Sequence, residues 1–182
     1  LPEAAAEVER CLAAGLCGVG ELAFYRSGID DICIECLAPI MALCRSFDVP
    51  VMIHTNEPVG HKYPGKTPNT LLQIYHLVKC YPDNTIILAH WGGGIFFYQL
   101  LKREVKETLS QVYYDTAASP FLYDPAVYRL AAELVGSEKI LFGTDFPLLK
   151  PGRYYKEIQD SGLDDAQRRK ILGENAAALL KL

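Results

Sequence analysis

Five short apolar runs, separated by longer amphipathic stretches, divide the chain into alternating elements. Each run is almost continuously apolar, which is typical of parallel strands that are buried on both faces. The runs predict strands at residues 18–24, 49–55, 85–90, 111–116 and 139–144. The stretches between them predict helices at residues 2–15, 30–47, 69–80, 95–109 and 125–135, with further helices between Pro151 and the last residue.

The spacing of the predicted strands indicates the fold class. Strand starts recur about every 26–36 residues, which is the length of one βα unit. Repeated βα units predict an α/β fold with a parallel sheet, either a (β/α)8 TIM-type barrel or an open doubly wound sheet. Glycines 92–94 do not match the Gly-x-Gly-x-x-Gly fingerprint of dinucleotide-binding folds. We therefore favour a TIM-type barrel in a single domain, residues 1–182, with about five of its eight βα units present.

Composition excludes several classes of function. Half of the 182 residues are apolar, 22% are charged, and the net charge is −4 without a basic tract, which argues against nucleic-acid binding. The apolar runs are too short to span a bilayer, so we expect no membrane partner. No signal peptide is visible, and we expect the six cysteines to be buried thiols in a reducing cytoplasm. The expected partner is a small-molecule substrate, and a homo-oligomer is possible.

Polar residues that bind metals or transfer protons follow three of the apolar runs. His54, His90 and Asp145 each occupy the place where the carboxyl end of a barrel strand presents chemistry. Imidazole and carboxylate groups there can bind a divalent metal or move a proton. A single histidine of this kind is more often a hydrogen-bonded core residue. Three such residues at equivalent positions together predict a metal site.

Around these residues the chain resembles the amidohydrolase superfamily. It is most similar to the branch that holds amidohydrolase-related metal-dependent hydrolases and the aminocarboxymuconate-semialdehyde and resorcylate decarboxylases. The resemblance extends in consistent order from residue 18 to residue 182. The matching segments are IHT (53–55), LAHWGGG (88–94), YYDTA (113–117), ILFGTDFP (140–147) and ILGENAA (171–177).

The resemblance implies roles for the three residues and a place in the barrel for each. The chain corresponds to strands 4 to 8, with the amino-terminal units missing. His54 corresponds to a metal ligand on the fifth strand, and His90 to a catalytic histidine on the sixth. Asp145 corresponds to the aspartate of the last strand, which binds the metal and takes part in proton transfer.

The chain departs from the family pattern at one point. The first strand of these enzymes supplies a His-x-His pair of metal ligands, and none of the four histidines forms such a pair. Either the chain is the carboxyl-terminal part of a longer enzyme, or it is a shortened relative that cannot hold a metal tightly. The missing strands favour the first explanation. With only two protein ligands we expect the chain alone to be inactive, because catalytic metal sites use three or more.

Two further acidic residues lie inside predicted strands. In some barrel hydrolases an acid on the fourth strand bridges two metals, and Glu21 has that position. Glu21 can equally form a hydrogen bond inside the barrel or orient a metal ligand from behind it. We interpret Asp115, which lies within its strand, as structural.

Several residues near strand ends are candidates for substrate binding. His61 and Tyr63 belong to a long loop rich in proline and glycine, and such loops often carry function. An arginine after a strand can pair with a substrate carboxylate, and an aromatic ring can form a pocket wall. Solvent exposure or simple packing explains each of them equally well. The candidates are Arg26, His61, Tyr63, Trp91 and Arg153.

The resulting hypothesis is a metal-dependent hydrolase that cleaves an amide, ester or lactone. A divalent ion, Zn²⁺ in preference to Mn²⁺ or another ion, would activate a water molecule. Asp145 would accept the proton of that water, and His90 would polarise the substrate. One alternative is a metal-dependent, non-oxidative decarboxylase of an aromatic or unsaturated acid. A second alternative is a non-catalytic barrel relative, since one barrel hosts many functions.

Overall fold

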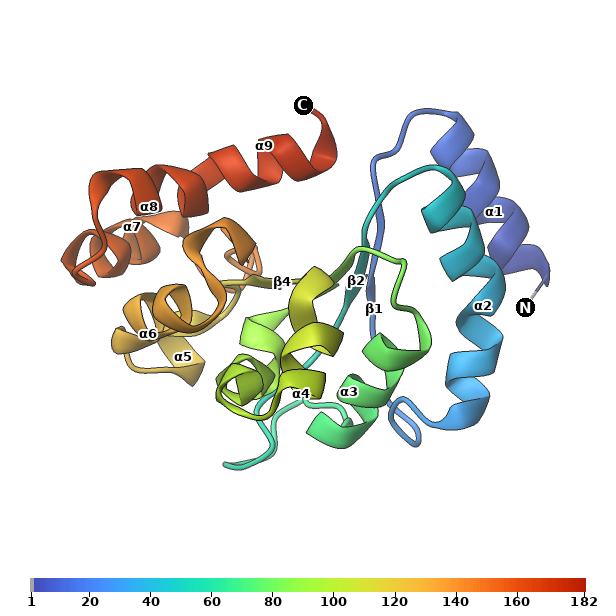
Figure 1. Cartoon of the computed structure of the whole chain (residues 1–182), viewed down its shortest axis with the longest axis horizontal. Coiled ribbons are helices and arrows are strands. Elements are labelled where there is room, and N and C mark those ends of the chain that lie inside the picture. The colour runs from blue at the N-terminus through green and yellow to red at the C-terminus, as the bar shows by residue number, and fades with distance from the viewer. Residues whose placement is uncertain (1) are drawn as a thin grey trace.

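The computed structural model describes residues 2–182, a parallel sheet flanked by helices (Figure 1). The strands are β1 (Val19–Leu22), β2 (Val51–Ile53), β3 (Ile86–Leu88), β4 (Val112–Asp115) and β5 (Ile140–Leu141). The α-helices are α1 (Pro2–Ala13), α2 (Asp31–Ser46), α3 (Leu71–Cys80), α4 (Arg103–Thr108), α5 (Ser119–Leu122), α6 (Ala126–Val135), α7 (Pro151–Asp160), α8 (Asp165–Arg169) and α9 (Asn175–Leu180). Three segments have 3₁₀ geometry: η1 (His90–Leu100), η2 (Leu109–Gln111) and η3 (Ser137–Lys139). A π-helical segment forms η4 (Lys170–Glu174).

The order of the strands identifies the architecture. They pair as β1-β2-β3-β4-β5, the order in which they occur along the chain, and every pair is parallel. Because crossovers between parallel strands are right-handed, a sheet that grows in one direction places its crossover helices on one face. A doubly wound sheet instead reverses direction and carries helices on both faces. The prediction of a partial TIM-type barrel is confirmed, and the doubly wound alternative is wrong.

Alternate side chains of each strand face different environments. Ile53, Leu88 and Tyr114 are fully buried between the sheet and the helices. The ring of Tyr114 packs edge-on against Phe96 of η1, with centroids 6.3 Å apart. Tyr113, on the opposite phase of β4, is only partly buried. The helix side of the sheet therefore holds the core, and the other side corresponds to the interior of the barrel.

The predicted elements differ from the observed ones at several positions. β2 ends one residue before His54 and β3 ends two residues before His90, so both histidines lie just beyond the strands. The predicted helix at residues 95–109 is two elements, because the chain is not helical between η1 and α4. The four-residue helix α5 was not predicted. It follows Ala118, whose left-handed backbone (φ 56°) turns the chain directly after β4.

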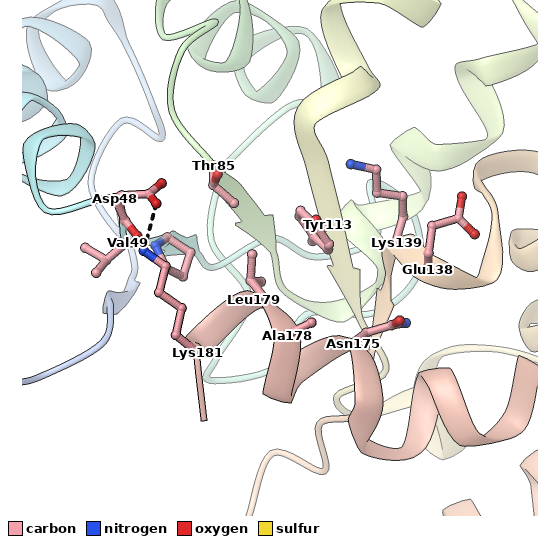
Figure 2. A pocket seen from close by; sticks show the side chains of 11 residues that line it. Asp48, Val49, Thr85, Tyr113, Glu138, Lys139, Asn175, Ala178, Leu179 and Lys181 are labelled. Carbon is pink, nitrogen blue, oxygen red and sulfur yellow. Dashed lines mark hydrogen bonds and ion pairs between the residues drawn. The ribbon is translucent and has the colours of Figure 1, made fainter.

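The amino ends of the strands border a cavity of about 420 Å³, one wall of which is α9. Figure 2 shows Lys181 paired with Asp48 (2.7 Å) on one side of the cavity and Lys139 on the other. The Lys139 ammonium lies 4.4 Å from the centre of the Tyr113 ring. This cavity is at the opposite end of the strands from the two histidines, and it is separate from the site they form.

Two expectations from composition can be compared with the structure. Within residues 2–182, no helix is both long enough and apolar enough to cross a membrane. The six cysteines are free thiols, but only Cys44 is buried. The expectation of buried cysteines is therefore wrong for the other five, of which Cys36 and Cys80 lie on exposed positions of helices.

Candidate metal centre

Three potential metal ligands meet at the carboxyl ends of the first three strands. Glu21 lies on β1, His54 follows β2 and His90 follows β3. One ligand atom from each residue lies within 4.8 Å of those from the other two. Glu21 Oε1 is 2.7 Å from His54 Nδ1 and 3.4 Å from His90 Nε2. Two imidazoles and one carboxylate form a donor set that suits several divalent transition metals.

The hydrogen bonds of the two histidines show which nitrogens are open to a metal. His90 Nδ1 lies 3.1 Å from the carbonyl oxygen of Ala117 and donates to it, which leaves the Nε2 lone pair facing Glu21 in the neutral ring. His54 Nδ1 donates to Glu21, while His54 Nε2 is buried without a hydrogen-bond partner. A buried polar atom without a partner is destabilising, so the His54 ring can still accept a partner such as a metal ion. The residues therefore fit a divalent ion.

The electrostatics of the centre follow from its short contacts. Burial opposes the charged form of Glu21, but hydrogen bonds from His54 and His90 outweigh this effect and lower the pKa of Glu21 to about 2. Burial likewise opposes the charged form of His90. The hydrogen bond to Glu21 and the charge of Asp115 outweigh it and raise the pKa of His90 to about 9. Without a metal, the cluster is held together by a carboxylate and an imidazolium.

The turn that carries His90 has an unusual backbone. All five residues of the segment His90–Gly94 have positive φ angles between 56° and 93°. Such a left-handed run is costly for residues with a side chain, and strain of this kind often lies at functional sites. Glycine is required within it, because a Cβ on Gly93 would lie 2.3 Å from the carbonyl oxygen of Asn56. The backbone at the start of η1 therefore packs directly against the loop that follows His54.

Side chains connect neighbouring loops beyond the point where the strands end. Thr55, after β2, donates to the carbonyl of Ala89 after β3. Asp115, at the end of β4, accepts hydrogen bonds from the backbone N–H groups of His90 (2.7 Å) and Ala117 (3.0 Å). Burial raises the pKa of Asp115 to about 6. These bonds continue the connection between β2, β3 and β4 after the ladder stops, and they support the residues that carry the chemistry.

Comparisons with known proteins identify the family of the chain. The model of the amidohydrolase family matches residues 1–182, the complete chain. The chain belongs to the amidohydrolase family. No curated protein sequence matches this chain significantly.

Solved structures share the fold of this chain. A dihydroxybenzoic acid decarboxylase from Polaromonas sp. JS666, with bound manganese and 2-nitroresorcinol, has a TM-score of 0.74 and 21% identity over 98% of the chain. A 2,6-dihydroxybenzoate decarboxylase complexed with 2,6-dihydroxybenzoate has a TM-score of 0.76 and 20% identity over 98%. A putative amidohydrolase from Staphylococcus aureus has a TM-score of 0.68 and 25% identity over 98%. The chain spans 65%, 66% and 69% of these structures, respectively.

Asp145 lies apart from the three-residue cluster. β5 ends at Leu141, and the chain then leaves the sheet in a turn, so Asp145 is exposed four residues beyond the strand. Its backbone is left-handed (φ 58°), and its carbonyl accepts a hydrogen bond from the N–H of Leu148. Among the described residues, the cluster of close metal-ligand atoms consists of Glu21, His54 and His90. The role of Asp145 as a ligand stays a prediction.

The predicted substrate-binding residues occupy varied surroundings. Arg26 and His61 are exposed, and Arg153 pairs with Glu157 on its own helix. Trp91 is fully buried, and its indole N–H donates to the Ser119 hydroxyl (2.6 Å). Of the two interpretations of Trp91, the structure favours core packing over a pocket wall, because the left-handed turn directs its ring into the core. The roles of the other residues stay predictions.

Tyr63 belongs to a group of hydrogen-bonded side chains, with Glu57 and Lys66, that orders the loop after β2. Its hydroxyl donates to Glu57 (2.8 Å), and the Lys66 ammonium pairs with the same carboxylate (2.7 Å). Lys66 also donates to the carbonyl of Val59 (2.9 Å). Burial opposes the charge of Glu57, but the hydrogen bonds from Lys66 and Tyr63 outweigh it and lower the pKa of Glu57. Sequence spacing identified the loop but missed Glu57 and the bonds that order it.

Proposed function

We propose that this chain belongs to a metal-dependent, non-oxidative decarboxylase of aromatic carboxylic acids. The observation that carries the proposal is the Glu21–His54–His90 cluster, at the strand ends of a fold shared with manganese-bound decarboxylases. The relatives of similar structure act on dihydroxybenzoates and 5-carboxyvanillate, according to their names. They favour the decarboxylase alternative over the hydrolase that the sequence first suggested. They also favour manganese over zinc as the first ion to test.

The chemistry of the proposed reaction defines what the residues must do. A divalent ion at the cluster would supply positive charge that attracts the substrate carboxylate. His54, His90 and Glu21 would hold that ion. Non-oxidative decarboxylation breaks the bond between the ring and the carboxylate, releases CO₂, and forms a new bond between the ring carbon and a proton. A group near the site must therefore donate a proton to carbon.

The activity is tested with the complete gene product, loaded with Mn²⁺. We expect it to convert a hydroxybenzoate such as 2,6-dihydroxybenzoate, or 5-carboxyvanillate, to the corresponding phenol, with one CO₂ released per phenol formed. Ester, amide and lactone substrates are assayed in parallel. Hydrolysis without decarboxylation would instead support the hydrolase. If the metal-loaded protein turned over neither class, the proposal would fail in favour of a binding protein.

We further propose that Asp145 donates the proton. Its carboxylate is exposed and separate from the metal cluster, as a group that exchanges protons with solvent needs to be. We expect Asp145→Asn to reduce kcat about 100-fold or more, in line with the loss of a general acid. We expect the Mn²⁺ affinity, measured by calorimetry, to remain unchanged. A loss of metal affinity in this variant would place Asp145 among the ligands, as the family resemblance implies.

A further inference from the structure

We propose that Asp115 is a positioning residue that sets the direction of His90 in the metal centre. The inference rests on the proposed metal function and extends it to a residue that sequence analysis interpreted as structural. Asp115 does not belong to the three-residue cluster. It acts through the backbone and the ring of His90, and its contacts show how.

One oxygen of Asp115 joins two loops. Asp115 Oδ1 accepts the backbone N–H of His90 (2.7 Å), which follows β3, and the N–H of Ala117 (3.0 Å), which follows β4. His90 has a left-handed backbone (φ 56°), and so has Ala118 next to Ala117. Both loops therefore hold strained conformations beside the same carboxylate. Hydrogen bonds to an ionised acceptor are stronger than neutral ones, which suits a group that must stabilise two such turns.

The same residues also hold the imidazole ring. Ala117, whose N–H is bound by Asp115, accepts with its carbonyl oxygen the hydrogen bond from His90 Nδ1 (3.1 Å). The bonds form a closed circuit from Asp115 to the backbone of His90, through the His90 ring to Ala117, and back to Asp115. The circuit fixes the Nδ1–H tautomer and directs Nε2 toward Glu21. Support of this kind, behind a metal-binding histidine, commonly tunes metal affinity.

The surroundings of Asp115 argue against a purely structural role. The residue is 5% exposed, and no Lys, Arg or His side chain within residues 2–182 lies within ion-pair distance of its carboxylate. A buried carboxylate without an ion-pair partner destabilises a fold. A neutral side chain could join the loops with less desolvation. We infer that Asp115 is there to hold His90, whose backbone N–H it binds directly and whose ring it supports through Ala117.

Three variants distinguish positioning from general stabilisation. Asp115→Ala removes both hydrogen bonds, and Asp115→Asn keeps an oxygen that can accept both. Asn175→Ala is the matched control, because the buried Asn175 amide also makes two bonds to backbone, to the carbonyls of Ser137 (2.7 Å) and Ile140 (2.8 Å). Those bonds lie at the amino end of β5, away from the metal centre.

Metal affinity is the first readout, measured by titrating each purified protein with Mn²⁺ alone in a calorimeter. We expect Asp115→Ala to bind Mn²⁺ about 10–100-fold more weakly than the parent, the usual effect of losing support behind a ligand. We expect Asp115→Asn to restore most of that loss. We expect Asn175→Ala to be less stable to urea but to bind Mn²⁺ like the parent. Unchanged affinity in Asp115→Ala, or an equal loss in Asn175→Ala, would overturn the proposal.

The tautomer of His90 is the second readout, taken from long-range ¹H–¹⁵N spectra of the metal-free protein at a pH about one unit above the His90 pKa of about 9, where the ring is neutral. We expect the parent and Asp115→Asn to show one dominant tautomer protonated at Nδ1, and Asp115→Ala to show a mixture. If Asp115→Ala also showed only the Nδ1–H tautomer, the proposal would be overturned, and this result does not depend on metal binding. If the parent bound no Mn²⁺, the proposed function would fail, while these spectra would still decide the role of Asp115.

Discussion

We expect Gly93→Ala to destabilise the protein by about 3 kcal/mol or more, measured by urea unfolding. Two effects add at this position. A left-handed backbone (φ 62°) costs a residue with a side chain about 1–2 kcal/mol. The new methyl group would also lie 2.3 Å from the carbonyl oxygen of Asn56, and relief of that overlap requires the η1 turn to move away from the loop. Because the turn carries His90, we expect Mn²⁺ binding to weaken in the fraction that remains folded.

Gly152→Ala is the matched control for this substitution. Gly152 lies in the first turn of α7, and a Cβ added there meets no atom within 4 Å. Alanine in a helix reduces the entropy of the unfolded chain, so we expect Gly152→Ala to be neutral or stabilising by about 0.5–1 kcal/mol. A Gly93→Ala protein as stable as the parent would contradict this expectation. Equal stability losses in both variants would show that the loss does not arise from the left-handed turn.

The fold could be predicted from the sequence because its strongest signals are local. Continuous apolar runs identify buried parallel strands, and their regular spacing identifies βα units. The residues at which the elements begin and end are harder to predict. The apolar run at residues 139–144 predicts a strand of six residues, but β5 pairs over only two, Ile140 and Leu141. At the edge of the sheet in this structure, β5 pairs with β4 alone, and hydropathy does not reveal where that pairing stops.

The candidate site could be predicted only in part, because it depends on contacts between strands. His54 and His90 stand out after apolar runs, and their rings lie 5.0 Å apart. Glu21 joins them because β1 pairs with β2, and no local pattern shows that pairing. Trp91 adjoins His90 in sequence, yet the left-handed turn buries its ring. Three glycines signal a turn at this point, but not the handedness that sets the direction of each side chain.

The metal-ligand set gives the second large effect. We expect His54→Ala to weaken Mn²⁺ binding at least about 100-fold, because it removes one of three protein donors and the nitrogen that is buried without a partner. A ligand that binds only the folded state stabilises it, by about 2.7 kcal/mol at a concentration of 100 Kd. We therefore expect Mn²⁺ to raise the melting temperature of the parent and to leave that of His54→Ala unchanged.

Two further variants show whether this effect belongs to the cluster. His76 is exposed on α3, where it contacts Asp31 (3.3 Å), so we expect His76→Ala to bind Mn²⁺ like the parent. Glu21→Gln keeps an oxygen that can accept from His54 Nδ1 but removes the negative charge, and we expect it to weaken Mn²⁺ binding at least about 10-fold. Normal binding in Glu21→Gln would mean that Glu21 only orients His54. Normal binding in His54→Ala would place the metal elsewhere, since the cluster would then retain only two donors, fewer than catalytic metal sites use.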